Sequence, residues 1–265
     1  MNFNNRKSEQ RHNVICIKWG STSYGAEDVN RLYRMVMKNT TMPISFYCFT
    51  EDATGIDHNI SIHPLPSLNI DPEDNKYAYR KEVGLCDDTL GGLTGQRVLF
   101  FDLDILIIDN IDCLFTHPKD DQFYIINDWN TKGNHVGQAS CYSFTVGTLG
   151  YVKKDFESDP KKVIKKFYTA SQAYLSSKVI ERDSHLNFWP DIWFRSFQFH
   201  CLPVGILRRF ITPKKPDNAK VLVFHGSPKA ADALIGKWTH REPWIKHILY
   251  KTCKPTPWLK QYLEQ

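Results

Sequence analysis

The sequence predicts a single α/β domain built on a mixed, mostly parallel β-sheet with helices on both faces. Two observations carry this prediction. Short apolar stretches of strand length alternate along the chain with longer amphipathic stretches of helical period. The chain of 265 residues is also long enough to bury one large core. In such a fold, ligands bind outside the carboxyl ends of the strands.

The first predicted unit is a strand at residues 14–19, a glycine-rich turn and a helix at about 27–39. Val29, Leu32, Tyr33 and Val36 share one face of that helix. Apolar stretches between turn residues predict the later elements in the same way. The further predicted strands are 44–50, 60–63, 97–108, 123–127, 142–146, 197–202 and 221–224, and the further helices are 75–90 and 160–177.

The two ends of the chain differ in composition from the middle. Residues 1–12 are polar, and we expect a flexible N-terminal segment there. Residues 13–237 form the predicted domain. Residues 238–265 are a basic, aromatic extension, which we expect to pack on the domain; a peripheral membrane contact through this tail is the alternative.

Charge and cysteine usage narrow the function classes. The net charge of +5 is small beside 34 basic and 29 acidic residues, and no nucleic-acid-binding module is present, so we expect no nucleic-acid partner. The seven cysteines form no C-x-x-C pair, which predicts buried thiols instead of a zinc site. Without an apolar leader or a run of about 20 apolar residues, the predicted location is the cytoplasm, with the inner face of a membrane left open.

The stretch RVLFFDLDILII, residues 97–108, places two carboxylates inside an apolar run. Side chains two residues apart in a strand point to the same side, so Asp102 and Asp104 would project together. Two such carboxylates repel each other unless a cation lies between them, and oxygen ligands suit Mg²⁺ or Mn²⁺. The alternative is that the strand ends at Phe101 and both aspartates face water in a turn.

These residues carry a resemblance. With FFDLD following a chain that opens on VICIKWG, the sequence resembles a GT-A (Rossmann-like) glycosyltransferase of the glycogenin-like, family 8-like kind. The resemblance implies that the D-x-D pair holds Mn²⁺, or Mg²⁺, on the diphosphate of a nucleotide sugar. Asp102 would then lie near the ribose and the metal, and Asp104 would be a direct metal ligand.

Further motifs extend the resemblance near the N-terminus. Lys18-Trp19-Gly20, the following Tyr24 and the helix V-N-R-L-Y, which contains Asn30, are similar to the family's nucleotide-binding segments. By this resemblance, Lys18, Trp19, Gly20, Tyr24 and Asn30 would bind the donor. Glu51 or Asp52 could also touch the base or ribose.

Two lysines and a histidine complete the implied donor site. Lys81 matches a family lysine near the donor phosphate or sugar. The stretch VLVFHGSPK, residues 221–229, resembles the family's strand plus H-G-x-x-K. It implies that His225 is the third protein ligand of the metal, and that Lys229 neutralises the departing phosphate.

Glycosyl transfer passes through an oxocarbenium-like centre, so a carboxylate near the anomeric carbon is expected. Asp128, after a predicted strand, resembles the family's donor-sugar contact, and Asp183 is the second predicted catalytic residue. Glu181 and Asp191 remain alternatives. Each of these residues could also be a helix cap or a solvated side chain.

The resemblance therefore implies a hexosyltransferase-type enzyme of glycan biosynthesis. It would move a sugar from a nucleoside-diphosphate sugar, most readily a UDP-sugar, to a glycan or lipid-linked acceptor. One alternative is a phosphohydrolase of the haloacid dehalogenase kind, in which Asp102 is the nucleophile. Another is a sugar-nucleotide-binding protein without turnover.

Overall fold

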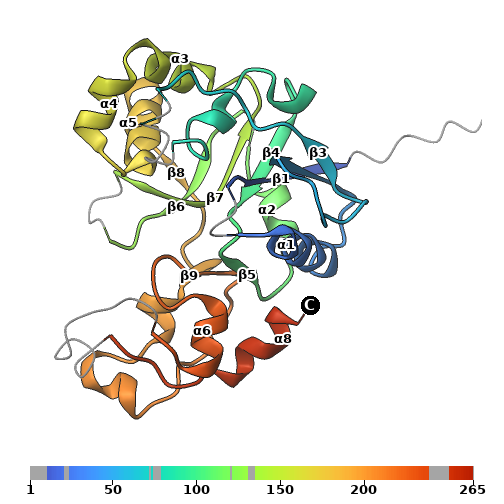
Figure 1. Cartoon of the computed structure of the whole chain (residues 1–265). Coiled ribbons are helices and arrows are strands. Elements are labelled where there is room, and N and C mark those ends of the chain that lie inside the picture. The colour runs from blue at the N-terminus through green and yellow to red at the C-terminus, as the bar shows by residue number, and fades with distance from the viewer. Residues whose placement is uncertain are drawn as a thin grey trace, which may run out of the picture.

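In the computed structural model, a seven-stranded sheet forms the centre of the molecule (Figure 1). The structure describes residues 11–20, 24–71, 73, 79–119, 121–130, 135–238 and 251–264. The sheet order is β3 (Ser61–His63), β2 (Ile44–Thr50), β1 (His12–Lys18), β4 (Arg97–Phe101), β7 (Gly137–Thr145), β6 (Tyr124–Asn127) and β8 (Asn187–Phe188).

The strand directions make this a mixed, mostly parallel sheet, which confirms the predicted fold class. Strands β3, β2, β1 and β4 run parallel, and β8 runs parallel to β6. Strand β7 alone runs antiparallel to its two neighbours, β4 and β6. The carboxyl ends of β1, β2, β4 and β6 therefore share one edge of the sheet, which we call the carboxyl edge.

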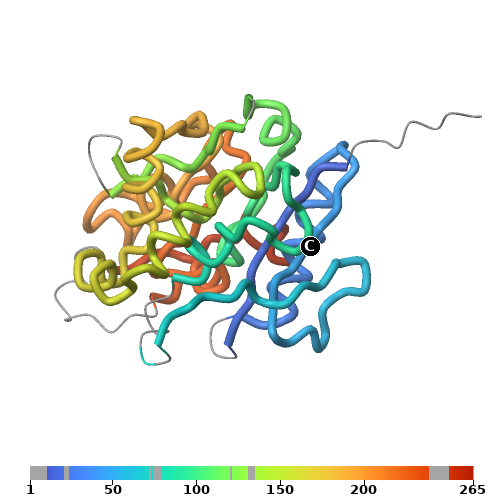
Figure 2. Tube along the Cα trace, turned by 90° about the horizontal axis from the view of Figure 1, so that it is seen from above, coloured from blue at the N-terminus to red at the C-terminus, as the bar shows by residue number. Residues whose placement is uncertain are grey.

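Helices cover both faces of the sheet because each central strand is apolar on both sides. In β4, Leu99 and Phe101 join the core under α1 (Ala26–Lys38), whereas Val98 and Phe100 join the core on the other face. That second core is covered by α3 (Gly150–Ser158), α4 (Pro160–Phe167) and α5 (Ser171–Asp183). Figure 2 shows these three helices on the side of the molecule away from the blue N-terminal strands.

A second, three-stranded sheet lies beside the first. Strand β10 (Val221–Val223) pairs antiparallel with β5 (Ile105–Ile107) and parallel with β9 (Phe194–Ser196). Helix α6 (Ala230–Ile235) and the C-terminal residues 251–264, with α8 (Lys260–Leu263), pack here. Leu259 and Tyr262 of that tail are buried. None of the helices in the described residues is both long enough and apolar enough to cross a membrane.

Several predicted elements differ from the structure. The single strand at 97–108 is wrong, because the chain leaves the first sheet after Phe101 and enters the second at Ile105. The strand at 197–202 is wrong as well, since Phe197–Cys201 is a π-helix. The helix at 160–177 is two helices, α4 and α5, and Tyr168, with a φ of 51°, lies between them.

The helix predicted at 75–90 is also not continuous. Its described part, from Tyr79 onward, contains turns and the 3-10 segments Gly84–Cys86 and Leu90–Gly92, and residues 74–78 lie outside the described residues. Helix α2 (Asp112–Thr116), helix α3, β8 and β9 were not predicted. All seven cysteines are free, and six are buried, as the sequence indicated.

Candidate active site

The acidic turn between β4 and β5 lies at the carboxyl edge. The backbone N–H of Asp102 donates to Ser140 O (2.9 Å), and Phe224 N donates to the carbonyl of Asp104 (3.1 Å). These bonds fix the turn to both sheets. The side chains of Asp102 and Asp104 are only 17% and 14% exposed. The strand does end at Phe101, as in the alternative interpretation, but the two aspartate side chains are largely buried instead of facing water.

Lys81 binds the first of these carboxylates. Its Nζ lies 2.5 Å from Asp102 Oδ2 and 3.5 Å from Glu82 Oε1, and all three side chains are largely buried. Burial alone would lower the pKa of Lys81, but Asp102 and Glu82 outweigh it and raise that pKa. Lys81 is therefore a charged group held against the D-x-D turn, and its contact with the donor stays a prediction.

Asp104 has two polar partners and one unpartnered oxygen. Its Oδ2 accepts from Lys229 Nζ (3.1 Å) and lies 3.5 Å from the hydroxyl of Tyr24. Its Oδ1 is buried and has no hydrogen-bond partner among the described residues. Burial, and then the nearby Asp102 carboxylate, raise the pKa of Asp104 to about 6 against the opposing effect of Lys229.

Tyr24 connects two cavities that flank the acidic turn. One, of about 260 Å³, is lined by Lys18, Trp19, Gly20, Tyr24 and Asp102 among others. The other, of about 200 Å³, is lined by Tyr24, Asp104 and Lys229 among others. Lys229 Nζ lies 2.7 Å from the Tyr24 hydroxyl, so these residues, 205 positions apart, meet at the shared wall. Most of the residues predicted to bind the donor therefore lie around these two adjoining cavities at the acidic turn.

Within this group, Lys18 and Gly20 connect the ends of β1 and β2. Lys18 Nζ donates to Asp52 O (2.9 Å) and Thr50 Oγ1 (3.3 Å), and Gly20 N donates to Glu51 Oε1 (2.6 Å). The Lys18 side chain is buried, so its amine stabilises the cavity wall. Trp19 and Gly20 are the more accessible residues at this rim.

His225 lies beside the acidic turn through the pairing of β10 with β5. Its Nε2 lies 2.7 Å from Ser196 Oγ, and its ring is stacked by Trp129 and by Phe199, each at a centroid distance of 5.7 Å. Burial lowers the pKa of His225, whereas the nearby Asp128 carboxylate opposes this shift. The structure thus brings Asp128, at the end of β6, to the same edge as the D-x-D turn.

The acidic turn fits a divalent cation in its chemistry. An unpartnered, buried carboxylate oxygen is costly, and a hard cation would satisfy it. Within the described part of the chain, however, no three histidine, cysteine, aspartate or glutamate side chains converge on one point. Since Nε2 of His225 contacts Ser196, the ligand set of Asp102, Asp104 and His225 stays a prediction.

Asp183 does not lie at this edge, so its predicted catalytic role has no geometric support. Helix α5 begins near the carboxyl edge, where Gln172 Oε1 accepts from Ala139 N (3.3 Å). The helix has 13 residues, or about 20 Å, and ends at the opposite edge. There Arg182 binds both Asp183 (2.7 Å) and Thr148 O (2.5 Å).

Other candidates are also placed by the fold. Asn30 is used within the structure, because its amide donates to Gly55 O (2.9 Å) and accepts from Asp57 N (2.8 Å). It lines neither cavity. Asp191 follows β8, which runs parallel to β6, so it lies on the carboxyl-edge side, and it acts electrostatically on His200. Asp191 is therefore better placed than Asp183.

Sequence reasoning missed Glu82 and Ser196. Glu82 is next to Lys81 in the sequence, but nothing local indicates that its side chain is buried. Ser196 is fully buried and contacts His225 from a strand 29 residues away. The only available signal was its place in the short, mostly apolar stretch 192–197.

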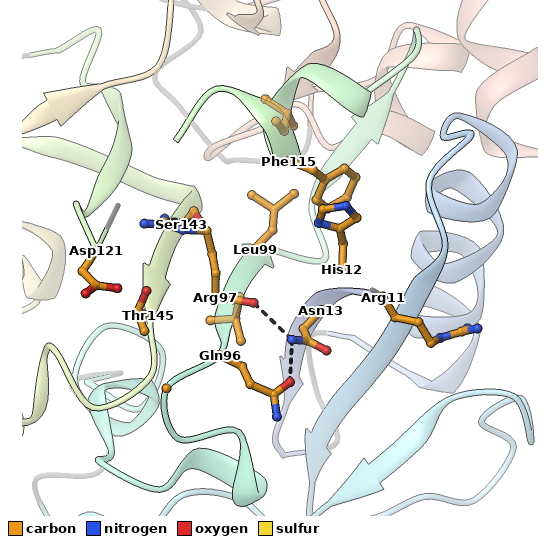
Figure 3. A pocket seen from close by; sticks show the side chains of 13 residues that line it. Arg11, His12, Asn13, Gln96, Arg97, Leu99, Phe115, Asp121, Ser143 and Thr145 are labelled. Atoms are coloured by element: carbon orange, nitrogen blue, oxygen red, sulfur yellow. Dashed lines mark hydrogen bonds between the residues drawn. The ribbon is translucent and has the colours of Figure 1, made fainter. Parts of the chain in front are cut away.

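A larger cavity, of about 420 Å³, lies at the opposite edge of the sheet (Figure 3). It opens at the amino ends of β1 and β4, where Asn13 Nδ2 donates to Gln96 Oε1 (3.0 Å) and to Arg97 O (3.2 Å). Asp102, Asp104 and Lys229 are not in its lining. Size alone therefore does not identify the candidate site.

Comparison with known proteins supports the fold. No protein-family model matches the sequence, and no curated protein matches it. Among solved structures, the apo-form glycosyltransferase GlyE of Streptococcus pneumoniae TIGR4 is similar, with a TM-score of 0.54 at 11% identity. The match covers 83% of this chain and 56% of GlyE, so this chain spans little more than half of that protein.

A second similar structure is the galactosyltransferase LgtC, solved in complex with donor and acceptor sugar analogs. Its TM-score is 0.51 at 12% identity, and the match covers 87% of this chain and 90% of LgtC. At such low identity the likeness defines the fold. The chain has the α/β fold of GT-A glycosyltransferases.

Proposed function

We propose that the chain is a metal-dependent glycosyltransferase of the glycogenin-like kind. It would transfer a hexose from a nucleoside-diphosphate sugar, most readily a UDP-sugar, to a glycan or lipid-linked acceptor in the cytoplasm. The observation that carries the proposal is Asp104. This buried carboxylate has one unpartnered oxygen and lies between Asp102 and Lys229, beside a cavity lined by Lys18, Trp19 and Gly20.

Different side chains have different roles in the proposed transfer. The cavity at the end of β1 would hold the base and ribose, with the Trp19 ring available for stacking. A divalent cation bound at Asp102 and Asp104 would supply positive charge to the diphosphate. Lys81 holds Asp102 in place (2.5 Å), and Lys229, which is 45% exposed, would neutralise the leaving phosphate.

The carboxylate proposed to face the donor sugar is Asp128. It is buried at the end of β6, and its charge acts on His225. A carboxylate there would stabilise positive charge at the anomeric carbon. Asp183 is left out, because it lies at the other edge of the sheet.

The first test is the melting temperature of metal-stripped protein with UDP, GDP, CDP or dTDP, each with and without Mn²⁺. A ligand at 100 times its Kd adds about 2.7 kcal/mol of stability. We expect one diphosphate to stabilise the protein only with the metal. Asp104→Asn should abolish the shift, whereas Asp109→Asn, which removes a half-exposed aspartate paired with Lys220, should keep it.

The other outcomes separate the alternatives. If no diphosphate shifts the melting temperature, and beryllium fluoride with Mg²⁺ stabilises the protein through Asp102, the phosphohydrolase hypothesis replaces the glycosyltransferase hypothesis. Metal-dependent nucleotide binding without sugar transfer or slow donor hydrolysis would instead indicate a binding protein.

A further inference from the structure

The segment 204–211 exposes an unusual number of large apolar side chains. Val204 and Phe210 are 84% and 71% exposed, and Ile206, Leu207 and Ile211 are 42–49% exposed. Single exposed apolar residues are ordinary on protein surfaces, but five within eight residues form a patch. We call residues 204–211 the apolar loop.

The backbone holds this loop outward. It contains the 3-10 turn Gly205–Arg209, and Gly205 has a φ of 55°, a conformation that glycine adopts without strain. The backbone N–H of Lys214 donates to Cys201 O (3.2 Å), which closes the base of the loop. In Figure 1 the orange loop lies at the end of the molecule away from α3 and α4.

Cations flank the apolar side chains along the chain. No acidic residue occurs between Asp191 and Asp217, and the same stretch contains five cations. Of these, Arg209, Lys214 and Lys215 are exposed. Apolar side chains together with cations match the boundary of an anionic bilayer, where acyl chains and negative headgroups meet.

The loop is also continuous with the candidate active site. Phe199 is 49% exposed and stacks on the ring of His225 at 5.7 Å. It belongs to the π-helix that ends at Cys201, three residues before Val204. An acceptor held in a bilayer under the loop would therefore lie on the same side of the molecule as His225.

We propose that the apolar loop docks on the surface of an anionic lipid bilayer. Val204 and Phe210 would enter the acyl boundary, while Arg209 and Lys214 would contact the headgroups. This assigns membrane contact to a different segment from the C-terminal tail. In the tail, Trp258 Nε1 donates to Pro213 O (2.8 Å), and Tyr262 is buried against Lys215.

The test is flotation of the full chain with vesicles of phosphatidylcholine alone or mixed with phosphatidylglycerol. We expect flotation with the anionic vesicles, weakened by high salt. The double variant Val204→Ser/Phe210→Ser should reduce binding by about tenfold or more. The matched control Met37→Ser/Ile62→Ser removes side chains that are 42% and 40% exposed on other elements, and should bind like the wild type.

Three results would overturn the proposal. The first is a wild-type chain that floats with neither vesicle, and the second is a correctly folded double variant that floats as well as the wild type. The third is a dimer in sedimentation experiments that the double variant disrupts, without vesicle binding, since a second copy would then cover the loop. None of these readouts uses nucleotide binding, so failure here is distinguishable from failure of the proposed transferase.

Discussion

Burial makes the charge of Asp104 costly in the metal-free protein. Its unpartnered Oδ1 and its pKa of about 6 report the same cost, which burial and the neighbouring Asp102 carboxylate cause. The buried carboxylate lowers the stability of the metal-free protein, and a bound cation would offset that cost. Two predictions at the scale of single side chains concern Asp104 and its neighbour Lys229.

Asp104→Asn should stabilise the protein in the presence of a chelator, although it abolishes metal-dependent binding. Because the pKa of this carboxyl is raised from 3.8 to about 6 in the folded state, the protein loses unfolding free energy as the pH rises between these two values. The loss is complete above pH 6. We therefore expect a gain of about 2–3 kcal/mol at pH 7 and almost none at pH 4. Urea unfolding at both pH values measures it, and an unchanged midpoint at pH 7 would contradict the prediction.

Lys229→Met should lower kcat for sugar transfer much more than it weakens nucleotide binding. The ammonium lies at the cavity wall beside Asp104 and would act most strongly on the charge of the departing diphosphate. Loss of one such group costs about 10²–10³ in kcat. Steady-state kinetics with the identified donor tests this, with Lys220→Met as the control because Lys220 pairs with Asp109 instead. Equal kcat values would remove Lys229 from the mechanism.

Among the secondary-structure elements, the break between β4 and β5 creates the site. Strand β4 belongs to the first sheet and β5 to the second, so the three residues between them must turn at the carboxyl edge. The sequence predicted the aspartates at this edge but favoured one continuous strand over an end at Phe101, since apolar residues on both sides look like one strand. In the structure β4 ends at Phe101, and β5 pairs with β10 in the other sheet.

Helix α2 illustrates how one carboxylate joins two elements. Asp112, in its first turn, accepts from Thr40 Oγ1 (2.5 Å), Thr41 Oγ1 (2.6 Å) and Thr41 N (2.9 Å), just after α1 ends. Burial alone would raise the pKa of Asp112, but these hydrogen bonds outweigh it and lower the pKa to about 2.

Asp112→Asn should therefore destabilise the protein at neutral pH. A lowered carboxyl pKa contributes stability above the unfolded value of 3.8, and that stability is lost as pH falls through about 2. With allowance for solvent screening, we expect a loss of about 1 kcal/mol at pH 7. Thermal unfolding of both proteins from pH 7 to pH 2 measures it, and a difference that is independent of pH would contradict the assignment.

For the molecule as a whole, the second sheet and the C-terminal tail form one core with the α1 side of the first sheet. Leu259 is fully buried in that core, and Thr256 N donates to Ala233 O (3.1 Å) of α6. The described tail residues therefore contribute to the stability of the whole domain.

Leu259→Ala should cost about 2–5 kcal/mol of unfolding free energy, because it removes a fully buried side chain and leaves a cavity. Ile235→Ala, at a side chain that is 66% exposed on α6, is the control and should change stability by about 0.5 kcal/mol or less. Urea unfolding compares the two. Similar losses in both variants would mean that the tail does not pack as described.

The first elements of the fold, as far as β2, were predictable from local patterns. The strand expected at 44–50 is β2 (Ile44–Thr50), and the helix expected at 27–39 is α1 (Ala26–Lys38). Such elements follow their own periodicity and end at turn residues. The run 197–202 is also rich in apolar residues, yet Phe197–Cys201 forms a π-helix, whose N-cap residue Ser196 accepts from Phe199 N through its Oγ. The spacing of apolar residues in the sequence does not distinguish the strand at 44–50 from the π-helix at 197–201.

The sequence by itself determined which chemical groups gather at the carboxyl edge. Lys18 ends β1 and Asp102 follows β4, and these parallel strands end at the same edge, so local patterns were sufficient for these two residues. The place of Lys229 was implied by the resemblance. Only the tertiary structure decided their partners, the burial that raises the pKa of Asp104, and the exclusion of Asp183. The physical reason is that a helix of about 20 Å carries Asp183 to the opposite edge, and that burial depends on segments far apart in the sequence.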